Sequence, residues 1–185
     1  MSTSGVRVRI ATEADVPALR TLIPESVRGL SRGFYSEAEI ESAIEHVFGV
    51  DSQLVADGTY FAADAEGTLV GCGGWSRRRT LYGGDQMKAD EDPLLDPGRD
   101  PARIRAFFVH PGWARRGVGA AILKACVDAA RDAGFHELEL AATLPGVPLY
   151  AAFGFEARER TAAPLPDGTR LPIVRMTRSI DGRGP

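Results

Sequence analysis

Cysteine and histidine are scarce in this sequence, and their scarcity excludes several kinds of site. Among 185 residues there are two cysteines, Cys72 and Cys126, and three histidines. Both cysteines lie in apolar runs, which is typical of buried thiols in a reduced protein and not of a disulfide framework. The histidines, His46, His110 and His136, lie far apart and lack the spacing of zinc ligands. We therefore expect no metal site.

Long apolar runs and an excess of positive charge are also missing. No stretch is apolar enough to span a bilayer, and the first residues do not resemble a signal peptide. The formal net charge is −3, which disfavours nucleic acid as a partner. Hydrophobic residues make up 44% of the chain and charged residues 25%, as in globular proteins. We expect one cytoplasmic domain over residues 1–185 that contacts no membrane, with its core at about 6–178.

The apolar residues that are present change their spacing along the chain, which predicts a mixed α/β domain. Alternation of apolar and polar residues predicts strands, and apolar residues three or four positions apart predict helices. Strands are expected at 6–10, 60–63, 69–76, 104–109, 137–140, 155–161 and 169–178. Helices are expected at 16–27, 36–48, 118–134 and 147–153.

Three features depart from these regular patterns. Pro24 should bend or interrupt the first helix, because its ring removes a hydrogen-bond donor and clashes with the preceding turn. The polar segment 77–101 predicts a long loop, and loops of this length are usually functional or disordered. The tail at 181–185 is expected to fray.

The segment from Arg115 to Ala120 has the composition of an anion-binding loop. It leaves a predicted strand and opens a helix, so its first amide groups lack intrahelical partners and suit an anion. Gly117 and Gly119 would let a phosphate oxygen approach the backbone, and Arg115 and Arg116 add positive charge. The segment is neither a Walker loop nor a full dinucleotide fingerprint. Taken alone, it fits a phosphate cradle and a flexible corner equally well.

Two motifs together resemble the GNAT superfamily of N-acetyltransferases. The first, Val109-His110-Pro111 followed by Ala114-Arg-Arg-Gly-Val-Gly119, resembles the acetyl-CoA signature of that family. The second, Tyr150-Ala-Ala-Phe-Gly154-Phe155, resembles the family's later tyrosine motif, and the order of elements matches from Val6 to Arg178. The resemblance implies an α/β (α+β) fold with a mixed, mostly antiparallel central sheet, a splayed cofactor strand and about four flanking helices.

The resemblance also implies where acetyl-CoA would bind. In the family, the pantetheine arm lies beside the splayed strand, and the following loop holds the pyrophosphate. Thr143 stands where relatives often have an asparagine, and Phe153 is expected to pack beside the cofactor. Ala114 replaces the usual Gln or Arg, so backbone amides must carry the phosphates, with Arg115 or Arg116 as candidates to replace the lost side-chain contact. The matching cofactor-binding positions are Phe107, Phe108, Val109, Arg115, Arg116, Gly117, Val118, Gly119, Ala120, Thr143 and Phe153.

Tyr150 matches the residue that commonly protonates the departing thiolate in this family. A phenol has a pKa near 10, close enough to that of a thiol to donate a proton to it. The alternative is that Tyr150 is a packing residue.

The usual base of the family is absent from the matching stretch, which contains Arg103 and Arg105. Glu139 is our candidate base, although a solvated strand glutamate is the simpler interpretation. His110 has a suitable intrinsic pKa but is expected to be exposed. Deprotonation through ordered water remains a third choice.

The function implied is transfer of an acetyl group from acetyl-CoA to a primary amine of a small molecule or peptide. The amine would attack the thioester directly in a ternary complex, with a backbone amide near Val109 stabilising the oxyanion. The alternative is a non-catalytic acyl-CoA-binding sensor or regulatory module. The acceptor pocket is expected between residues 22–48 and 77–101. The sequence leaves a homodimer open, and its acidic balance disfavours charged tRNA as the acceptor.

Overall fold

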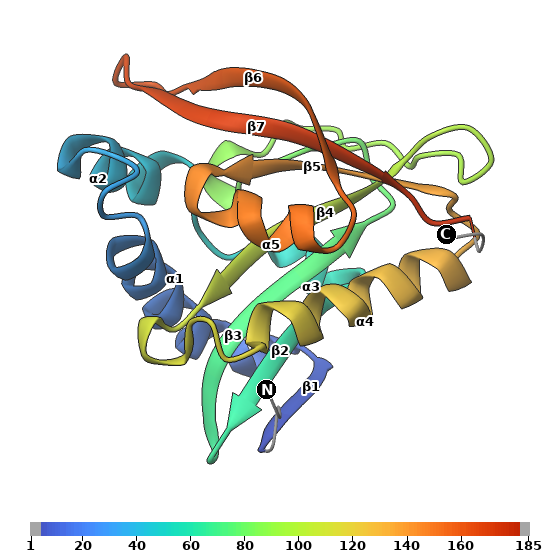
Figure 1. The fold of residues 1–185 in the computed structure, drawn as a ribbon, viewed down its shortest axis with the longest axis horizontal. Helices are drawn as coiled ribbons and strands as arrows, with labels where there is room; N and C mark the ends of the chain where they lie inside the picture. The colour runs from blue at the N-terminus through green and yellow to red at the C-terminus, as the bar shows by residue number, and fades with distance from the viewer. Residues whose placement is uncertain (1–4, 182–185) are drawn as a thin grey trace.

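The computed structural model describes residues 5–181, and these residues form one central seven-stranded sheet (Figure 1). The strand order is β1-β2-β3-β4-β5-β7-β6, and every neighbouring pair is antiparallel except β4 and β5. The strands are β1 (Val6–Ile10), β2 (Tyr60–Ala65), β3 (Thr68–Ser76), β4 (Ala102–Val109), β5 (Glu137–Thr143), β6 (Glu156–Pro164) and β7 (Arg170–Ser179). The predicted strands are confirmed, and β2, β5 and β6 each continue a few residues further than expected.

Five α-helices flank the sheet in the described chain, where about four were predicted. They are α1 (Val16–Leu30), α2 (Glu37–His46), α3 (Ser52–Ala56), α4 (Val118–Asp132) and α5 (Val147–Ala152). The missed helix is α3, which is only five residues long. The Asp51 carboxylate begins it by accepting hydrogen bonds from the amides of Gln53 and Leu54, at 3.1 and 3.2 Å. A helix this short buries one side chain, Leu54, and therefore leaves no periodic pattern in the sequence.

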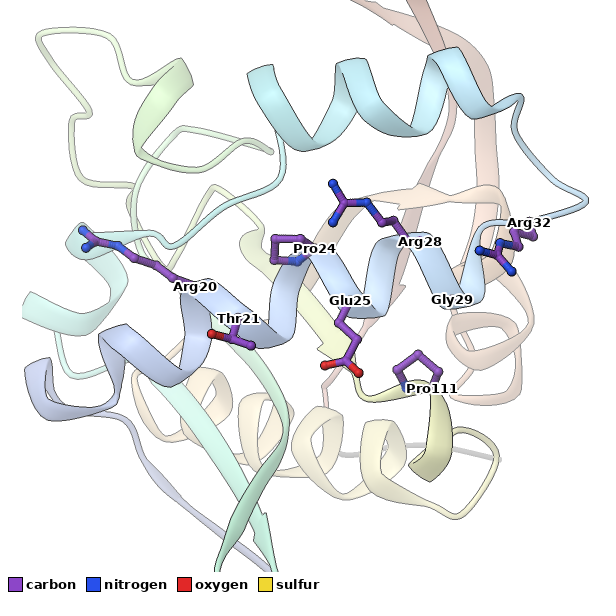
Figure 2. A pocket seen from close by; sticks show the side chains of 8 residues that line it. All are labelled: Arg20, Thr21, Pro24, Glu25, Arg28, Gly29, Arg32 and Pro111. Carbon is purple, nitrogen blue, oxygen red and sulfur yellow. The ribbon is translucent and has the colours of Figure 1, made fainter.

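Helix α1 continues through Pro24, so of the two expectations for this residue, a bend or an interruption, the interruption is wrong (Figure 2). An interior proline costs a helix about 3 kcal/mol. The apolar face of α1 offsets this cost by packing Leu19, Leu22 and Ile23 against the sheet, since each fully buried side chain of this size contributes about 1.5–3 kcal/mol.

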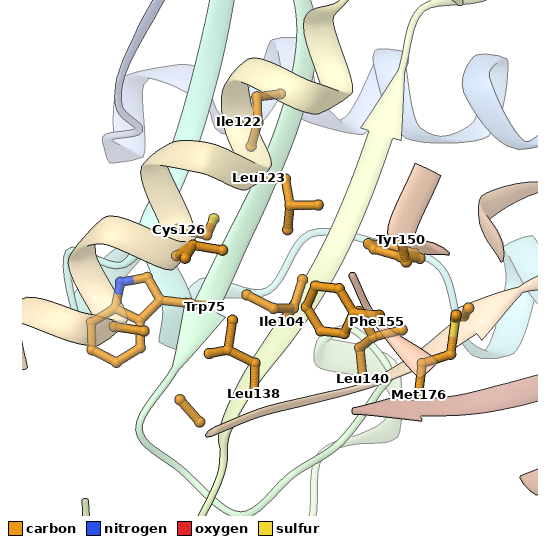
Figure 3. Close-up of a cluster of buried hydrophobic side chains, with 14 of the residues drawn as sticks. Trp75, Ile104, Ile122, Leu123, Cys126, Leu138, Leu140, Tyr150, Phe155 and Met176 are labelled. Carbon is orange, nitrogen blue, oxygen red and sulfur yellow. The ribbon is translucent and has the colours of Figure 1, made fainter. Parts of the chain in front are cut away.

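The two faces of the sheet carry separate hydrophobic clusters. On one face, α4 and α5 cover a cluster that includes Ile104, Leu138 and Leu140 (Figure 3). On the opposite face, residues of α1, α2 and α3 pack against residues such as Tyr60 and Phe108. Figure 1 shows α4 and α5 in front of the sheet. Each site residue on β4 or β5 can therefore be assigned to the α4 face or to the α1 face.

The loop at 77–101 is ordered by specific contacts, so of the two expectations for this segment, disorder is wrong. Arg78 pairs with Asp57 at 2.7 Å. The amide of Arg79 donates to the carbonyl of Pro93, and the amide of Leu95 donates to the carbonyl of Arg77. The loop thus folds back on itself, with Leu95 packed against the cluster on the α4 face and Tyr82 against the cluster on the α1 face.

Neither a membrane span nor a metal cluster is found within residues 5–181. None of the helices there is long and apolar enough to cross a bilayer. No three His, Cys, Asp or Glu side chains in that range gather in a way that could hold a metal ion. Of the tail predicted to fray, Asp181 contacts His136, and residues 182–185 lie outside the described part of the chain.

Candidate active site

Strands β4 and β5 stop pairing after their first residues, and the unpaired stretch between them is called the slot below. Their parallel pairing is limited to Ala102 with Leu138 and Arg103 with Glu139. Beyond these pairs, β4 stays with β3 and β5 stays with β7. The slot therefore has a closed end near Arg103 and an open end near Val109, as the resemblance implied for the cofactor strand.

A bulge in β4 begins where the slot opens. The register with β3 shifts between Cys72 and Gly74, and Ala106 has a φ of 56°, which is strained for a residue with a Cβ. The buried hydroxyl of Tyr60 donates to the Ala106 carbonyl at 3.1 Å. A Cβ on Gly73 would lie 2.7 Å from the Phe107 ring, so glycine makes room for that ring.

The bulge changes which face the side chains of β4 occupy. Before it, Ile104 belongs to the cluster under α4. After it, Phe107 and Val109 pack on that face, whereas Ala106 and Phe108 pack on the α1 face. The simple alternation predicted for 104–109 is therefore wrong beyond Arg105, because one extra residue in a bulge reverses the facing of all that follow.

The loop between β4 and α4 presents free amide groups at the open end of the slot. Gly117, with φ of 84°, is the N-cap of α4, and Arg115 also has positive φ, at 59°. The Ala121 amide is the first to bond back, to the Gly117 carbonyl at 3.0 Å. The amides of residues 118–120 therefore lack intrahelical acceptors and are available to an anion.

The glycines and arginines of this loop have distinct roles. Gly117 supplies a left-handed backbone, whereas a Cβ on Gly119 would lie 3.1 Å from Leu149 of α5. Among the described residues, neither Arg115 nor Arg116 forms a salt bridge, and both are exposed. The Arg116 guanidinium lies 3.8 Å from the centre of the Trp113 ring. The loop is thus both a tight corner and a cluster of unpaired donors.

Tyr150 and Thr143 flank the slot on the side of β5. A Cβ on Gly146 would lie 3.2 Å from the Tyr150 ring and 3.3 Å from the Thr143 hydroxyl oxygen, so both side chains are close to Gly146. The Tyr150 ring makes edge contacts with Phe107, at a centroid distance of 6.0 Å, and with Phe155, at 5.8 Å. Figure 3 shows Tyr150 and Phe155 in the cluster.

Tyr150 is buried, with only 8% of its surface exposed, and yet its hydroxyl makes no hydrogen bond within residues 5–181. Burial raises the pKa of this phenol well above its ordinary value, and the nearby thiol of Cys126 adds to the effect. Phe153, at the end of α5, packs half-buried against the same cluster. The phenol is therefore neutral at physiological pH, with its hydroxyl available to a ligand.

Glu139 lies at the closed end of the slot and on the α1 face. Its neighbours Leu138 and Leu140 are buried under α4, so the Glu139 side chain points the other way. Its carboxylate pairs with Arg103 at 2.8 Å and with Arg175 of β7 at 3.4 Å. Arg103 lies in the stretch where the resemblance leads us to expect the family's base. In the structure, the Glu139 carboxylate lies beside Arg103.

Arg105 belongs to a buried ion pair that the sequence did not indicate. Its guanidinium lies 2.8 Å from Asp51 and donates to the Gly83 carbonyl, and Lys88 lies 3.0 Å from the same carboxylate. Burial lowers the pKa of Arg105, and Asp51 opposes this shift. Because Asp51 is distant in sequence and looks like an ordinary N-cap, no local pattern could have predicted this pairing.

The Val109 amide, the candidate oxyanion donor, and His110, a candidate base, both contact side chains of α1. The Val109 amide donates to the Ser26 hydroxyl of α1 at 3.0 Å, so it can serve a ligand only if that hydroxyl turns away. His110 accepts from the Gly112 amide at Nδ1, and its Nε2 lies 3.2 Å from Glu25 of α1. The imidazole is therefore directed toward α1.

Comparison with known proteins places this geometry in a family. The model of the Acetyltransferase (GNAT) family matches residues 25–155. The chain belongs to this family. The resemblance drawn from the two motifs is thus confirmed, and so is the α/β fold class.

Solved GNAT structures share the fold over nearly the whole chain. A GCN5-related N-acetyltransferase from Rhodopseudomonas palustris has a TM-score of 0.72 at 22% identity, covering 97% of this chain and 99% of that one. A putative acetyltransferase from Salmonella typhimurium, solved with its cofactor acetyl-CoA, has a TM-score of 0.63 at 16% identity, with 98% and 97% covered. A GCN5-related N-acetyltransferase from Kribbella flavida has a TM-score of 0.61 at 23% identity, with 97% and 100% covered. No curated protein matches the chain in sequence.

Proposed function

We propose that this GNAT protein transfers an acetyl group from acetyl-CoA to the primary amine of a small molecule or peptide, by direct attack in a ternary complex. The observation that carries the proposal is the end of pairing between β4 and β5, with unbonded amides at one end of the unpaired stretch and Tyr150 beside it. In this arrangement the amides after Gly117 would hold the phosphates, and the arm of the cofactor would lie along β4 toward Tyr150. The acetyl-CoA bound to the Salmonella typhimurium relative supports the choice of donor.

The residues around the slot fit acetyl-CoA. The amides of residues 118–120, with Arg115 and Arg116, would hold the pyrophosphate at the open end. Beyond Arg103, β4 and β5 are no longer paired with each other, so the facing backbone groups of β4 can bond to an extended arm. When bound, acetyl-CoA supplies an activated acyl group as a thioester. Since the arm would run back along β4 from the loop, the acyl group would lie toward the closed end.

Tyr150 would hold a proton at its hydroxyl until the thiolate leaves. Its raised pKa keeps the phenol neutral, and its contacts with Phe107 and Phe155 fix the ring at the edge of the slot. Because no described residue accepts a hydrogen bond from this hydroxyl, it is free to donate to a group in the slot.

Glu139 would accept a proton from the amine through a water molecule. It lies at the closed end and on the face opposite Tyr150, so acid and base would act from opposite sides of the sheet. Arg103 and Arg175 orient its two oxygens.

We expect Glu139→Gln to lower kcat by about 100-fold, as is typical when a general base is removed. The remaining rate should rise steeply with pH, because the unprotonated amine must then come from solution. Glu159→Gln is the matched control, since Glu159 lies 3.6 Å from Arg175 but is exposed on β6. Equal pH–rate profiles for both variants would remove Glu139 from the mechanism.

A panel of small amines and peptide amines, assayed for release of CoA, tests the function itself. Turnover of at least one amine is expected. The absence of the family's usual base favours the alternative of an acyl-CoA sensor, and binding of acetyl-CoA in calorimetry without turnover of any amine would support that alternative. Failure to bind acetyl-CoA at all would overturn both. An amine of a small molecule or peptide as acceptor and a cytoplasmic location stay predictions from the sequence. The sequence leaves open whether the protein forms a homodimer.

A further inference from the structure

A groove of about 560 Å³ lies on the outer face of α1, apart from the slot between β4 and β5. All of its lining except Pro111 comes from α1 and the turn that follows it (Figure 2). The lining residues are Arg20, Thr21, Pro24, Glu25, Arg28, Gly29, Arg32 and Pro111.

The groove exists because short residues alternate with long ones along this helix. A Cβ on Gly29 would lie 2.2 Å from Pro111, so the loop after β4 packs directly on the backbone of α1 there. Thr21 and Pro24 are also short, and they leave a depression between the long side chains of Arg20 and Arg28.

The charge of the groove is mainly positive. Within residues 5–181, neither Arg20 nor Arg32 forms a salt bridge, and both are exposed. Arg28 pairs with Glu41 of α2, with both side chains half exposed.

The one acidic side chain in the groove is turned away from the arginines. Glu25 lies 3.2 Å from Nε2 of His110 and points toward Pro111 (Figure 2). It therefore leaves the guanidinium groups of Arg20 and Arg32 uncompensated, although the whole chain has a formal net charge of −3.

We propose that this groove binds an acidic segment of another polypeptide in an extended conformation. Arg20 lies ten residues before the end of α1 at Leu30, which is about 15 Å along a helix, and Arg32 lies in the turn beyond that end. An extended peptide of about five or six residues covers slightly more than that length. A single small anion could not reach both ends, and the net negative charge of the chain disfavours a nucleic acid strand. Binding of this kind requires no acetyl transfer, so the proposal is independent of the proposed function.

The test is fluorescence anisotropy with a fluorescein-labelled peptide of six glutamates, at low and at moderate salt. Arg20→Glu combined with Arg32→Glu should weaken binding by about tenfold or more, since two attractive contacts become repulsive. The control, Arg7→Glu with Arg160→Glu, changes the net charge equally on exposed positions of β1 and β6, the two edge strands. It should stay within about threefold of the wild-type affinity. Binding should weaken as salt is raised.

Four results would overturn the proposal. They are no binding by the wild type at low salt, equal weakening in both double variants, loss of binding only in Arg115→Glu with Arg116→Glu, and tighter binding of a six-nucleotide single-stranded DNA. Circular dichroism checks that each variant is folded. Arg20→Gln with Arg32→Gln, which removes charge without reversing it, should give a smaller loss in the same direction.

Discussion

Among single residues, Tyr150 combines a buried ring with a hydroxyl that no described side chain engages. Tyr150→Phe preserves the contacts with Phe107 and Phe155 and removes only the hydroxyl. We expect kcat to fall by about 100-fold, the usual contribution of a general acid, whereas the affinity for acetyl-CoA should change little. Steady-state kinetics and calorimetry separate the two quantities. An unchanged kcat would make Tyr150 a packing residue.

Gly117 offers a second test at this scale, because its backbone conformation and its proximity to a bound phosphate can be separated. Gly117→Ala adds only the strain of a Cβ at φ of 84°, which costs about 1–2 kcal/mol. Gly117→Glu adds the same strain and a negative charge. In calorimetry with CoA, the alanine variant should lose about tenfold in affinity or less, and the glutamate variant at least about 100-fold. Equal losses would contradict the phosphate cradle.

The candidate site residues that the sequence indicated are those that local motifs define. Gly117, Gly119 and Tyr150 lie in short motifs, and the structure places all three around the slot. Asp51 and Ser26 were missed, because their roles depend on partners 54 and 83 residues away, Arg105 and Val109. A capping aspartate and a helical serine have no sequence pattern that distinguishes such distant contacts.

At the level of secondary structure, strand β4 shows where prediction from alternation ends. Its extent was predicted within two residues, but its bulge was not. The bulge depends on the Tyr60 hydroxyl, which holds the Ala106 carbonyl, and on Gly73, which makes room for Phe107. These contacts come from β2 and β3, so the residues of β4 alone cannot indicate the bulge.

The strain at Ala106 gives this bulge a measurable signature. Ala106→Gly should relieve a positive φ that costs an alanine about 1–2 kcal/mol. Ala125→Gly, in the middle of α4, is the matched control and should destabilise the protein by about 1 kcal/mol. In urea unfolding, Ala106→Gly should therefore be more stable than Ala125→Gly by at least about 1 kcal/mol. Equal stability would mean that the bulge is not strained.

For the whole molecule, the two hydrophobic clusters bury groups that ionise only at alkaline pH. Cys72 and Tyr35 lie in the cluster on the α1 face, and Cys126 and Tyr150 lie in the cluster on the α4 face. Burial raises the pKa of Cys72 from 9.0 to about 12 and that of Tyr35 from 10.0 to about 12. Burial also raises the pKa of Cys126 well above its ordinary value. The folded chain therefore keeps protons that the unfolded chain loses.

The free energy of unfolding should consequently fall as pH rises above about 9. The folded pKa values are raised, so this contribution is complete below the unfolded values and is lost as pH rises toward the folded ones. Each such group contributes a slope of about 1.4 kcal/mol per pH unit in that window. Urea unfolding under reducing conditions, from about pH 7.5 to about pH 10.5, measures the slope. Cys126→Ala should reduce this slope by about the contribution of one group, because the variant lacks one buried thiol proton. This holds whatever the variant does to stability at neutral pH. A stability that stays flat to pH 10.5 would mean that these thiols and phenols ionise as readily in the folded chain as in the unfolded one.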